Sequence, residues 1–276
     1  MKPIRIGLIG FGTVGRGTYE VLQRNQHEIA RRAGRGIEVA AITVRDVDKA
    51  RAIVGSKVPI SSNFNDVIRN PDIDIVVELI GGYEPAYALA MEAITRGKHV
   101  VTANKALLAR HGNQLFDAAR SHGVMIAFEA AVAGGIPIIK ALREGLTANR
   151  IEWIAGIING TSNFILSEMR SRGITFDAAL EEAQRLGYAE ADPTFDVEGI
   201  DAAHKLAILS SIAFGVPINI DAAYTEGITH LAKEDIKYAE QLGYRIKLLG
   251  ITKRTAAGIE LRVHPPLVPL QRLLAN

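Results

Sequence analysis

The feature that most constrains the fold is a glycine-rich turn near the N-terminus. An apolar run at residues 4–9 precedes the turn, and a stretch with helical periodicity follows it. The turn consists of Gly10, Phe11, Gly12, Thr13, Val14 and Gly15. A G-x-G-x-x-G pattern between a strand and a helix is the fingerprint of dinucleotide-binding βαβ units. Without that context the pattern is weak evidence, because glycine is a common residue. The N-terminus of the following helix offers free N–H groups and a positive dipole end to phosphates.

The rest of the first half alternates strand-like and helix-like patterns. Helical patterns at 62–69, 84–96 and 106–121 separate apolar runs at 37–44, 73–82, 98–103 and 124–130. Repeated βα alternation is typical of a doubly wound parallel sheet. We therefore predict an α/β fold with a Rossmann domain over residues 1–130, whose ligand binds at the carboxyl ends of the strands.

Charged and small residues follow the predicted strands at this edge. Arg45 comes after the second strand, where an arginine suits the 2′-phosphate of NADP, and Lys57 is a second candidate for that role. The adjacent Asp46 leaves the use of NAD open. Gly81 ends the third predicted strand, and Lys105 follows the fourth as a catalytic or binding candidate. We predict NADP as the cofactor, with NAD as an alternative.

The pattern changes in the second half, after a bend rich in small residues at 129–142. We interpret 151–158 as a buried strand. Three helices are expected at about 159–170, 176–186 and 199–214. Two strands are expected at 243–254 and 259–269, joined by a turn at 256–258. The sequence thus predicts a second, α+β domain over residues 131–276, whose partly antiparallel open sheet suits pairing with a second subunit.

One stretch of this half, residues 187–209, concentrates charge. It holds Glu190, Asp192, Asp196, Glu198 and Asp201, followed by Lys205. Asp201 and Lys205 are four residues apart and would share one face of a helix. Because such a set of charges is costly to bury, we interpret it as the reaction centre. The alternative is a solvated acidic loop with an ordinary surface ion pair.

Composition excludes several classes of protein. Hydrophobic residues make up 48% and charged residues 22%, which is typical of a globular protein with a sizeable core. The 32 basic and 30 acidic residues nearly cancel, without a basic tract that would suggest nucleic acid. The absence of cysteine excludes disulfides, thiolate metal sites and thioester chemistry. No apolar run reaches the roughly 18 residues of a membrane span, and no signal peptide is recognised, so we expect a cytoplasmic protein.

The motifs occur in an order that resembles homoserine dehydrogenases. The matching segments are GFGTVGRG, VVELIGG, HVVTANKALLA, EAAVAGGIPII, NGTSNFIL and GYAEADPTFDVEGIDAAHKLAIL, and the resemblance extends to about residue 269. The last segment is the most specific. Members of that family interconvert L-aspartate 4-semialdehyde and L-homoserine with NAD(P), in the biosynthesis of threonine, methionine and isoleucine.

The resemblance implies roles for individual residues. Lys205 matches the general acid that protonates the substrate carbonyl, and Asp201 matches the carboxylate beside it. Glu190 matches the group that holds the substrate amino group, and Lys105 lies at the junction of nicotinamide and substrate. The same resemblance implies a homodimer formed by the second domain. It also implies a site for a monovalent cation such as sodium, bound by the carbonyls of Glu129, Val132, Gly134 and Ile136.

Elementary chemistry agrees with these roles, because hydride reduction of an aldehyde builds negative charge on oxygen that an ammonium group can stabilise and protonate. Full-length relatives continue past the HPPLVP segment, so we expect the second domain to be incomplete at Asn276. Another NAD(P)-dependent amino-acid dehydrogenase and a catalytically inactive cofactor-binding fragment are the alternatives. A phosphorylating semialdehyde dehydrogenase is excluded, since it needs a nucleophilic cysteine.

Overall fold

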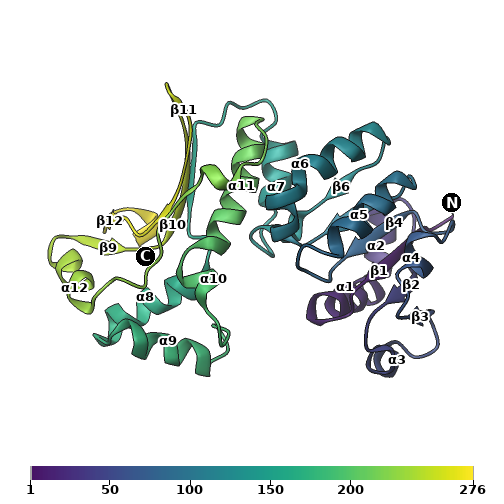
Figure 1. Cartoon of the computed structure of the whole chain (residues 1–276), viewed down its shortest axis with the longest axis horizontal. Helices are drawn as coiled ribbons and strands as arrows, with labels where there is room; N and C mark the ends of the chain where they lie inside the picture. The colour runs from purple at the N-terminus through teal and green to yellow at the C-terminus, as the bar shows by residue number, and fades with distance from the viewer. Residues whose placement is uncertain (1, 276) are drawn as a thin grey trace. The chain divides into compact units, whose positions relative to one another are not determined.

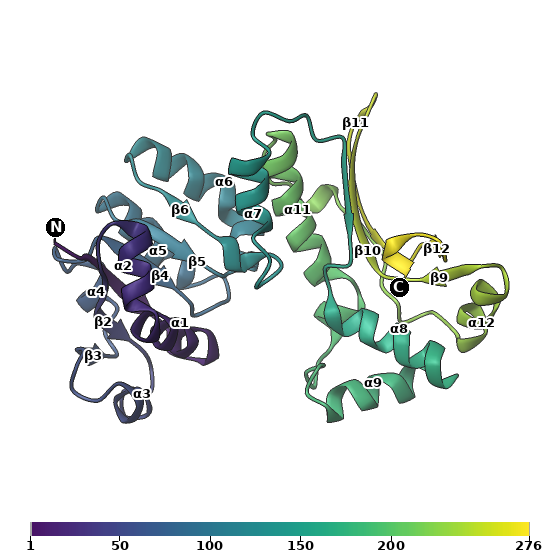
Figure 2. The same cartoon turned by 180° about the vertical axis from the view of Figure 1, so that it is seen from behind.

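The computed structural model describes residues 2–275 of the 276-residue chain. The chain divides into two compact units, Met1–Ile138 and Ile139–Asn276. The first unit is coloured purple to teal and the second teal to yellow in Figure 1, and Figure 2 shows both from behind. The predicted division between residues 130 and 131 falls in the bend that precedes this boundary.

The first unit is built on a six-stranded sheet in the order β3-β2-β1-β4-β5-β6. Its strands are β1 (Ile4–Ile9), β2 (Ile37–Thr43), β3 (Ile60–Ser61), β4 (Ile75–Glu78), β5 (His99–Thr102) and β6 (Ile126–Ala127). All neighbouring strands are parallel. The predicted α/β, doubly wound parallel fold is therefore confirmed. The two-residue strand β3 and the helix at Val47–Val54 were not predicted.

Helices flank this sheet (Figures 1 and 2). They are α1 (Thr13–Arg24), α2 (Gln26–Ala33), α3 (Val47–Val54), α4 (Asn65–Ile68), α5 (Ala86–Thr95), α6 (Lys105–Ser121) and the 3-10 turn η1 (Glu129–Ala131). The helical pattern after the glycine turn is split at Asn25, which ends α1 and precedes α2. The core combines aliphatic side chains of the strands, among them the fully buried Leu8 and Ile42, with side chains from α1 and α3 such as Tyr19 and Val54.

The second unit contains a four-stranded mixed sheet in the order β7-β10-β11-β8 and a separate antiparallel pair, β12-β9. The strands are β7 (Trp153–Gly156), β8 (Tyr224–Thr225), β9 (Tyr244–Ile246), β10 (Leu249–Thr255), β11 (Gly258–His264) and β12 (Leu267–Pro269). β10 is antiparallel to both β7 and β11, and β8 is parallel to β11. The α+β class of this unit agrees with the prediction.

Three details of this sheet differ from the prediction. The strand predicted at 243–254 is divided into β9 and β10, because the backbone of Leu248 between them bonds to the side chain of Asn163. The strand predicted at 259–269 is divided into β11 and β12, because Pro265 and Pro266 cannot donate to a ladder. The predicted buried strand is an edge strand in this unit, and its Trp153 is 60% exposed. An apolar run therefore marked a strand but not its burial.

The helices of the second unit lie mostly between residues 160 and 241. They are α7 (Ile138–Lys140), which crosses the boundary of the units, the π-helical turn η2 (Ala141–Gly145), α8 (Gly160–Arg172), α9 (Phe176–Arg185), α10 (Thr194–Val197), α11 (Ile200–Phe214), η3 (Ile220–Ala222), α12 (Lys233–Gln241) and η4 (Leu273–Ala275). α11 packs against β10 and β11 and supplies the fully buried Leu206 and Ile208. This packing anchors the helix that carries Asp201 and Lys205.

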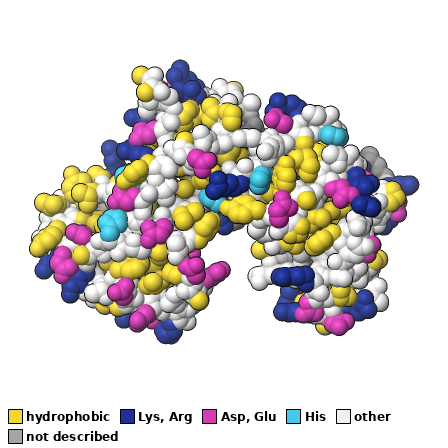
Figure 3. Space-filling view, in the orientation of Figure 1, with side chains coloured by type: hydrophobic (Ala, Val, Ile, Leu, Met, Phe, Trp, Pro, Cys, Tyr) yellow, Lys and Arg dark blue, Asp and Glu magenta, His cyan; other side chains and the backbone are white. Residues whose placement is uncertain are grey.

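The surface mixes charges of both signs. Acidic and basic side chains are interspersed on the face shown in Figure 3, over both units. None of the helices within residues 2–275 combines the length and the apolar character needed to cross a membrane.

Candidate active site

Asp201 and Lys205 lie on one face of α11, as their spacing predicts. Lys205 Nζ donates a hydrogen bond of 2.6 Å to Asp201 Oδ2. The Asp201 side chain is 5% exposed and that of Lys205 is 20% exposed. Asp201 also belongs to the first turn of α11, where the helix dipole favours negative charge. The pair is therefore nearly buried, unlike an ordinary ion pair on a helix surface.

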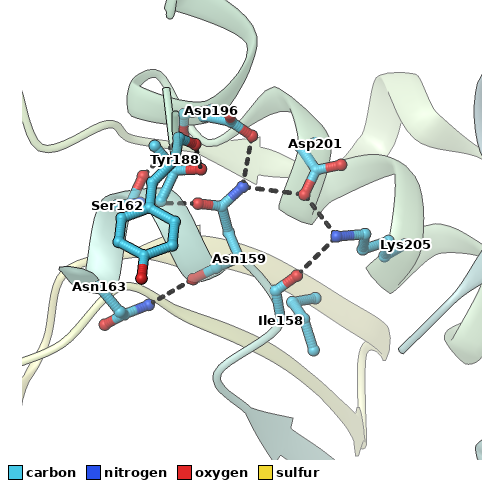
Figure 4. A network of polar contacts seen from close by, with 9 residues as sticks. Ile158, Asn159, Ser162, Asn163, Tyr188, Asp196, Asp201 and Lys205 are labelled. Carbon is cyan, nitrogen blue, oxygen red and sulfur yellow. Dashed lines mark hydrogen bonds and ion pairs between the residues drawn. The ribbon is translucent and has the colours of Figure 1, made fainter. Parts of the chain in front are cut away.

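The Lys205 ammonium is held by a second, backbone contact. Its Nζ also donates to the carbonyl oxygen of Ile158 at 2.9 Å, and Ile158 lies just after β7 (Figure 4). An ammonium group has three N–H donors, and two of them are used by these contacts. Within residues 2–275 the structure gives no partner for the third donor. Lys205 lines a pocket, so this donor can reach a group bound there.

Asn159 links this pair to a second carboxylate. Its Nδ2 donates to Asp196 Oδ1 at 2.7 Å and to Asp201 Oδ2 at 2.9 Å. Its Oδ1 accepts from Ser162 N at 2.8 Å and so caps α8. Figure 4 shows the amide between the two carboxylates, with only 3% of Asn159 exposed. Two carboxylates, one amide and one ammonium thus form a continuous network.

These residues surround a pocket of about 400 Å³ in the second unit. Its lining consists of Asn159, Gly160, Thr161, Phe164, Tyr188, Asp196, Asp201 and Lys205. The rings of Phe164 and Tyr188, 4.8 Å apart, form an apolar wall. The volume lies in the range of small-molecule sites, roughly 300–1,000 Å³. The charged part of this lining comprises one cation and two carboxylates.

The other acids of the 187–209 stretch do not line this pocket. Glu190 is exposed, and it is its backbone carbonyl that accepts from Gln184 Nε2 at 3.1 Å. Glu198 accepts from Thr229 Oγ1 at 2.9 Å. Asp192 accepts from Thr194 N, and hydrogen bonds from Thr194 lower the pKa of its carboxyl group. The structure thus brings Asp196, Asp201 and Lys205 together and leaves Glu190 outside.

The glycine turn of the first unit has the geometry that the fingerprint requires. A Cβ on Gly15 would lie 2.3 Å from the carbonyl oxygen of Gly10, so only glycine allows α1 to pack this closely. A Cβ on Gly12 would meet no atom within 4 Å, which leaves open space above the turn. Phe11 packs its ring against Tyr19, whereas Thr13 and Val14 are exposed. Phe11 can therefore offer a ligand only its backbone.

At the end of β2, Arg45 is exposed and Asp46 has a structural role. The Asp46 carboxylate accepts from Lys49 N at 3.0 Å and caps α3. Lys57 is also exposed. No hydrogen bond or ion pair of the Arg45 guanidinium is found within the described part of the chain, so its charge is available to a ligand.

Sequence reasoning missed a buried network at the ends of β4 and β5. Glu78 is 0% exposed; its Oε1 accepts from Ile80 N at 2.9 Å and from Gly81 N at 3.3 Å, and its Oε2 accepts from Thr102 Oγ1 at 2.6 Å. The carboxylate thereby shapes the loop that contains Gly81. A glutamate inside the apolar run 73–82 was the sequence signal for it.

The neighbouring Asn104 fixes the start of α6. Its Oδ1 accepts from Leu107 N at 3.0 Å, and its Nδ2 donates to the carbonyl of Gly82 at 2.7 Å. Lys105, the first residue of α6, follows directly and is partly buried. The structure therefore places Gly81 and Lys105 on two segments that are joined by one hydrogen-bond network.

The bend at 129–136 is built from unusual backbone conformations. Ala133 has φ +52°, and Gly135 has φ +87°. Val132 N approaches the carbonyl of Glu129 at 3.5 Å, and Ile138 N donates to that of Ile136 at 2.8 Å. Within residues 2–275 no group of three or more His, Cys, Asp or Glu side chains could hold a metal ion. A cation at this bend would thus depend on backbone carbonyls.

The parallel sheet with its glycine turn defines the first unit as a dinucleotide-binding domain, joined to an α+β unit that carries a charged pocket. Two family models match the chain: "Homoserine dehydrogenase, NAD binding domain" over residues 10–129 and "Homoserine dehydrogenase" over residues 137–276. The chain belongs to the homoserine dehydrogenase family, which confirms the resemblance seen in its motifs.

Individual relatives agree with this assignment. The homoserine dehydrogenase of Pseudomonas aeruginosa is 65% identical over 276 residues, which are 100% of this chain and 63% of that protein. The crystal structure of a homoserine dehydrogenase from Thiobacillus denitrificans is 68% identical with a TM-score of 0.97, covering 100% of this chain and 64% of that one. A hyperthermophilic archaeal homoserine dehydrogenase in complex with NADPH is 27% identical, with a TM-score of 0.82. The match covers 99% of this chain and 85% of that one. The chain thus spans just under two thirds of the first two proteins.

Proposed function

We propose that this chain carries the catalytic region of a homoserine dehydrogenase, which interconverts L-homoserine and L-aspartate 4-semialdehyde with NADP(H). The observation that carries the proposal is the nearly buried Asp201–Lys205 pair on the wall of a pocket of about 400 Å³, in a chain of this family. The pathway is the biosynthesis of threonine, methionine and isoleucine.

The proposed proton transfer uses Lys205. In the reductive direction NADPH supplies a hydride, with both electrons, to the aldehyde carbon. The third N–H of the Lys205 ammonium donates its proton to the carbonyl oxygen, and the product is the hydroxyl of homoserine. In the oxidative direction neutral Lys205 accepts the hydroxyl proton. Asp201 orients the ammonium group and stabilises its charge.

The substrate is a zwitterion, and the pocket offers partners for both of its charges. The Asp196 and Asp201 carboxylates suit its ammonium group, and Glu190 is assigned to the same group by the resemblance to the family. Gly160 and Thr161 begin α8 and line the pocket, so their N–H groups and the helix dipole suit the α-carboxylate. The aromatic wall suits the methylene groups.

The proposed cofactor site lies on the first unit. Gly10, Gly12, Gly15 and the exposed Thr13 and Val14 form the pyrophosphate turn, with Phe11 contributing its backbone. The exposed Arg45 favours the 2′-phosphate, so NADP is preferred over NAD. The NADPH complex of the archaeal relative supports this preference. Gly81 and Lys105 are assigned to the nicotinamide end, and Lys105 also to the substrate.

The bend at 129–136 is the proposed site of a monovalent cation. Carbonyls of Glu129, Val132, Gly134 and Ile136 are the proposed ligands of a monovalent cation such as sodium. Each carbonyl oxygen has two lone pairs, so the backbone hydrogen bonds to Glu129 and Ile136 leave ligand capacity.

The proposed homodimer forms through the four-stranded sheet of the second unit. Its edge strands β7 and β8 expose Trp153 to 60% and Tyr224 to 57%. Exposed aromatic residues on an open sheet are typical of a surface that a second subunit covers.

The deciding experiment incubates the purified chain with NADP and a panel of amino acids that includes L-homoserine, and follows the absorbance of reduced nicotinamide. Turnover with L-homoserine and with no other amino acid of the panel supports the proposal. Turnover with another member of the panel would identify a different amino-acid dehydrogenase. NADPH binding by calorimetry, without any turnover, would leave a cofactor-binding fragment.

A further inference from the structure

We infer that Asn159 is a positioning residue for proton transfer: its amide group holds the Asp201 carboxylate in the orientation that places Lys205 Nζ, and it links that pair to Asp196. The inference rests on the function proposed for the pocket and deepens it. The sequence alone does not distinguish Asn159 from the other polar residues at the start of the helix expected at 159–170.

The orientation of the amide is fixed from both ends. Nδ2 has two N–H donors, and both are directed at carboxylates, Asp196 on α10 and Asp201 on α11. Oδ1 accepts from Ser162 N. Turning the amide over would place Oδ1 against two carboxylates and Nδ2 against an N–H donor, so only one orientation is compatible with its surroundings. The cap of α8 thus determines which way the donors point.

The bond to Asp201 is shared with the lysine. Asp201 Oδ2 accepts from Asn159 Nδ2 at 2.9 Å and from Lys205 Nζ at 2.6 Å. Moving this oxygen therefore moves the ammonium group as well. The carbonyl of Ile158, next to Asn159 in the chain, gives Nζ its other anchor. Residues 158 and 159 together fix Nζ from a segment outside α11 (Figure 4). The third N–H of Lys205, which lines the pocket, can then serve a group bound there.

The amide also reduces repulsion between like charges. The charged side chains that line the pocket are Asp196 from α10 and Asp201 and Lys205 from α11. Two carboxylates next to one ammonium leave one negative charge in excess. A donor to each carboxylate offsets part of the repulsion between the two acids.

Two substitutions separate positioning from helix capping. Asn159→Ser and Asn159→Asp both keep an oxygen that can cap α8, while both remove the Nδ2 donors. Charge-assisted hydrogen bonds are strong, so we expect kcat for homoserine oxidation to fall roughly 10- to 100-fold in Asn159→Ser. In Asn159→Asp the added carboxylate stabilises the Lys205 ammonium. The neutral lysine needed for oxidation then forms only at higher pH, and the acidic limb of the kcat/KM profile shifts to higher pH.

Asn163→Ser is the matched control. Asn163 lies one turn further along α8, is similarly buried, and bonds to the backbone of Asn159 and Leu248 rather than to a carboxylate. Its loss should lower the urea midpoint without moving the pH profile. If Asn159→Asp keeps the wild-type profile, or if Asn159→Ser at equal folded fraction loses no more kcat than Asn163→Ser, the positioning role is wrong.

A second measurement does not depend on turnover. Carboxyl ¹³C NMR of the full chain should show changed chemical shifts for the Asp196 and Asp201 carboxyl carbons in Asn159→Ser, because both carboxylates lose a hydrogen-bond donor. Unchanged chemical shifts would overturn the inference even if homoserine is oxidised. Changed chemical shifts in a chain that oxidises no homoserine would sustain the coupling and reject the proposed function. If Asn159→Asp does not fold, the kcat and NMR measurements on Asn159→Ser still test the inference.

Discussion

Two asparagines, Asn104 in the first unit and Asn159 in the second, occupy nearly the same local setting but hold different partners. Each caps a helix through Oδ1, at 3.0 Å for Asn104 and 2.8 Å for Asn159. Asn104 directs its Nδ2 to the backbone carbonyl of Gly82, whereas Asn159 directs it to two carboxylates. The same cap thus shapes a backbone loop in one unit and arranges charges in the other.

The carboxylates near the two asparagines differ in the same way. Glu78, close to Asn104, is fully buried and has three donors, all from backbone or hydroxyl groups of its own unit. Asp196 and Asp201 face a pocket, and the cation beside them has a donor to spare. Burial of a charge therefore does not by itself mark a site. What marks it is hydrogen-bonding capacity directed into an accessible cavity.

The largest effect should come from the cation of the pocket. Lys205→Ala removes the proposed proton donor, and general acid–base catalysis contributes roughly 10²–10⁴-fold, so kcat for homoserine oxidation should fall by that factor. Calorimetric affinity for NADPH should stay the same, because Lys205 lies in the second unit. Near wild-type turnover in Lys205→Ala would show that the network around Lys205 is structural, like the network around Glu78, and not catalytic.

The next effect concerns stability in the first unit. Glu78→Gln replaces an acceptor of Ile80 N and Gly81 N by an amide, and hydrogen bonds to charged groups contribute about 1.5–3 kcal/mol each. We expect a lower urea midpoint and weaker NADPH binding, because the loop with Gly81 loses its anchor. Glu38→Gln, at an exposed position of β2, is the control. Equal midpoints for the two variants would show that the buried carboxylate does not shape this loop.

Cofactor choice should respond more weakly. Arg45→Asp replaces the proposed partner of the 2′-phosphate by a carboxylate that suits ribose hydroxyls, so the ratio of kcat/KM for NADP to that for NAD should fall about tenfold or more. Arg35→Asp, just before the amino end of the same strand, changes the net charge equally and should leave the ratio unchanged. A common response of both variants would assign the effect to overall charge.

The sequence predicted the fold of the first unit well because its signals are local. The glycine turn, the apolar runs and the βα alternation each arise within a few residues. The second sheet was less predictable. Leu248 interrupts a long strand because it bonds to Asn163, a residue 85 positions away, and no local pattern reports such a contact. The exposure of Trp153 likewise depends on strand order rather than on the run that contains it.

The site shows the same division. Asp201 and Lys205 were paired from their spacing alone, since a helix places residues four apart on one face. Asn159 lies 42 positions before Asp201, and its role follows only once α8 and α11 are folded together. The acidic stretch contains both Asp196 and Glu190, and only the structure separates the first, which lines the pocket, from the second, which is exposed. Helical spacing thus identifies pairs, and tertiary contacts determine what orients them.

The smallest expected effect lies away from both asparagines, at His264 on β11. Burial and the neighbouring Arg262 lower the pKa of its imidazole, against opposing contributions from Glu226 and Glu260. In the unfolded chain histidine titrates near pH 6.5, about its reference value, so below that pH the unfolded state binds more protons than the folded state. The contribution of neutral His264 to stability is therefore complete above this pH and is lost as the pH falls towards the lowered value.

His264→Gln should accordingly flatten the fall of the urea midpoint between neutral and mildly acidic pH. The same urea series on Asn163→Ser should keep the wild-type pH dependence, because Asn163 is uncharged and bonds to backbone groups rather than to a carboxylate. The urea series also sets the pH range in which the activity of the Asn159 variants can be compared with that of the wild type. A shift in the activity profile of Asn159→Asp reports on Lys205 only at pH values where the second unit is fully folded, and the His264 variant locates that boundary. If the urea midpoints of His264→Gln and the wild type fall equally with pH, this histidine does not cause the loss of stability.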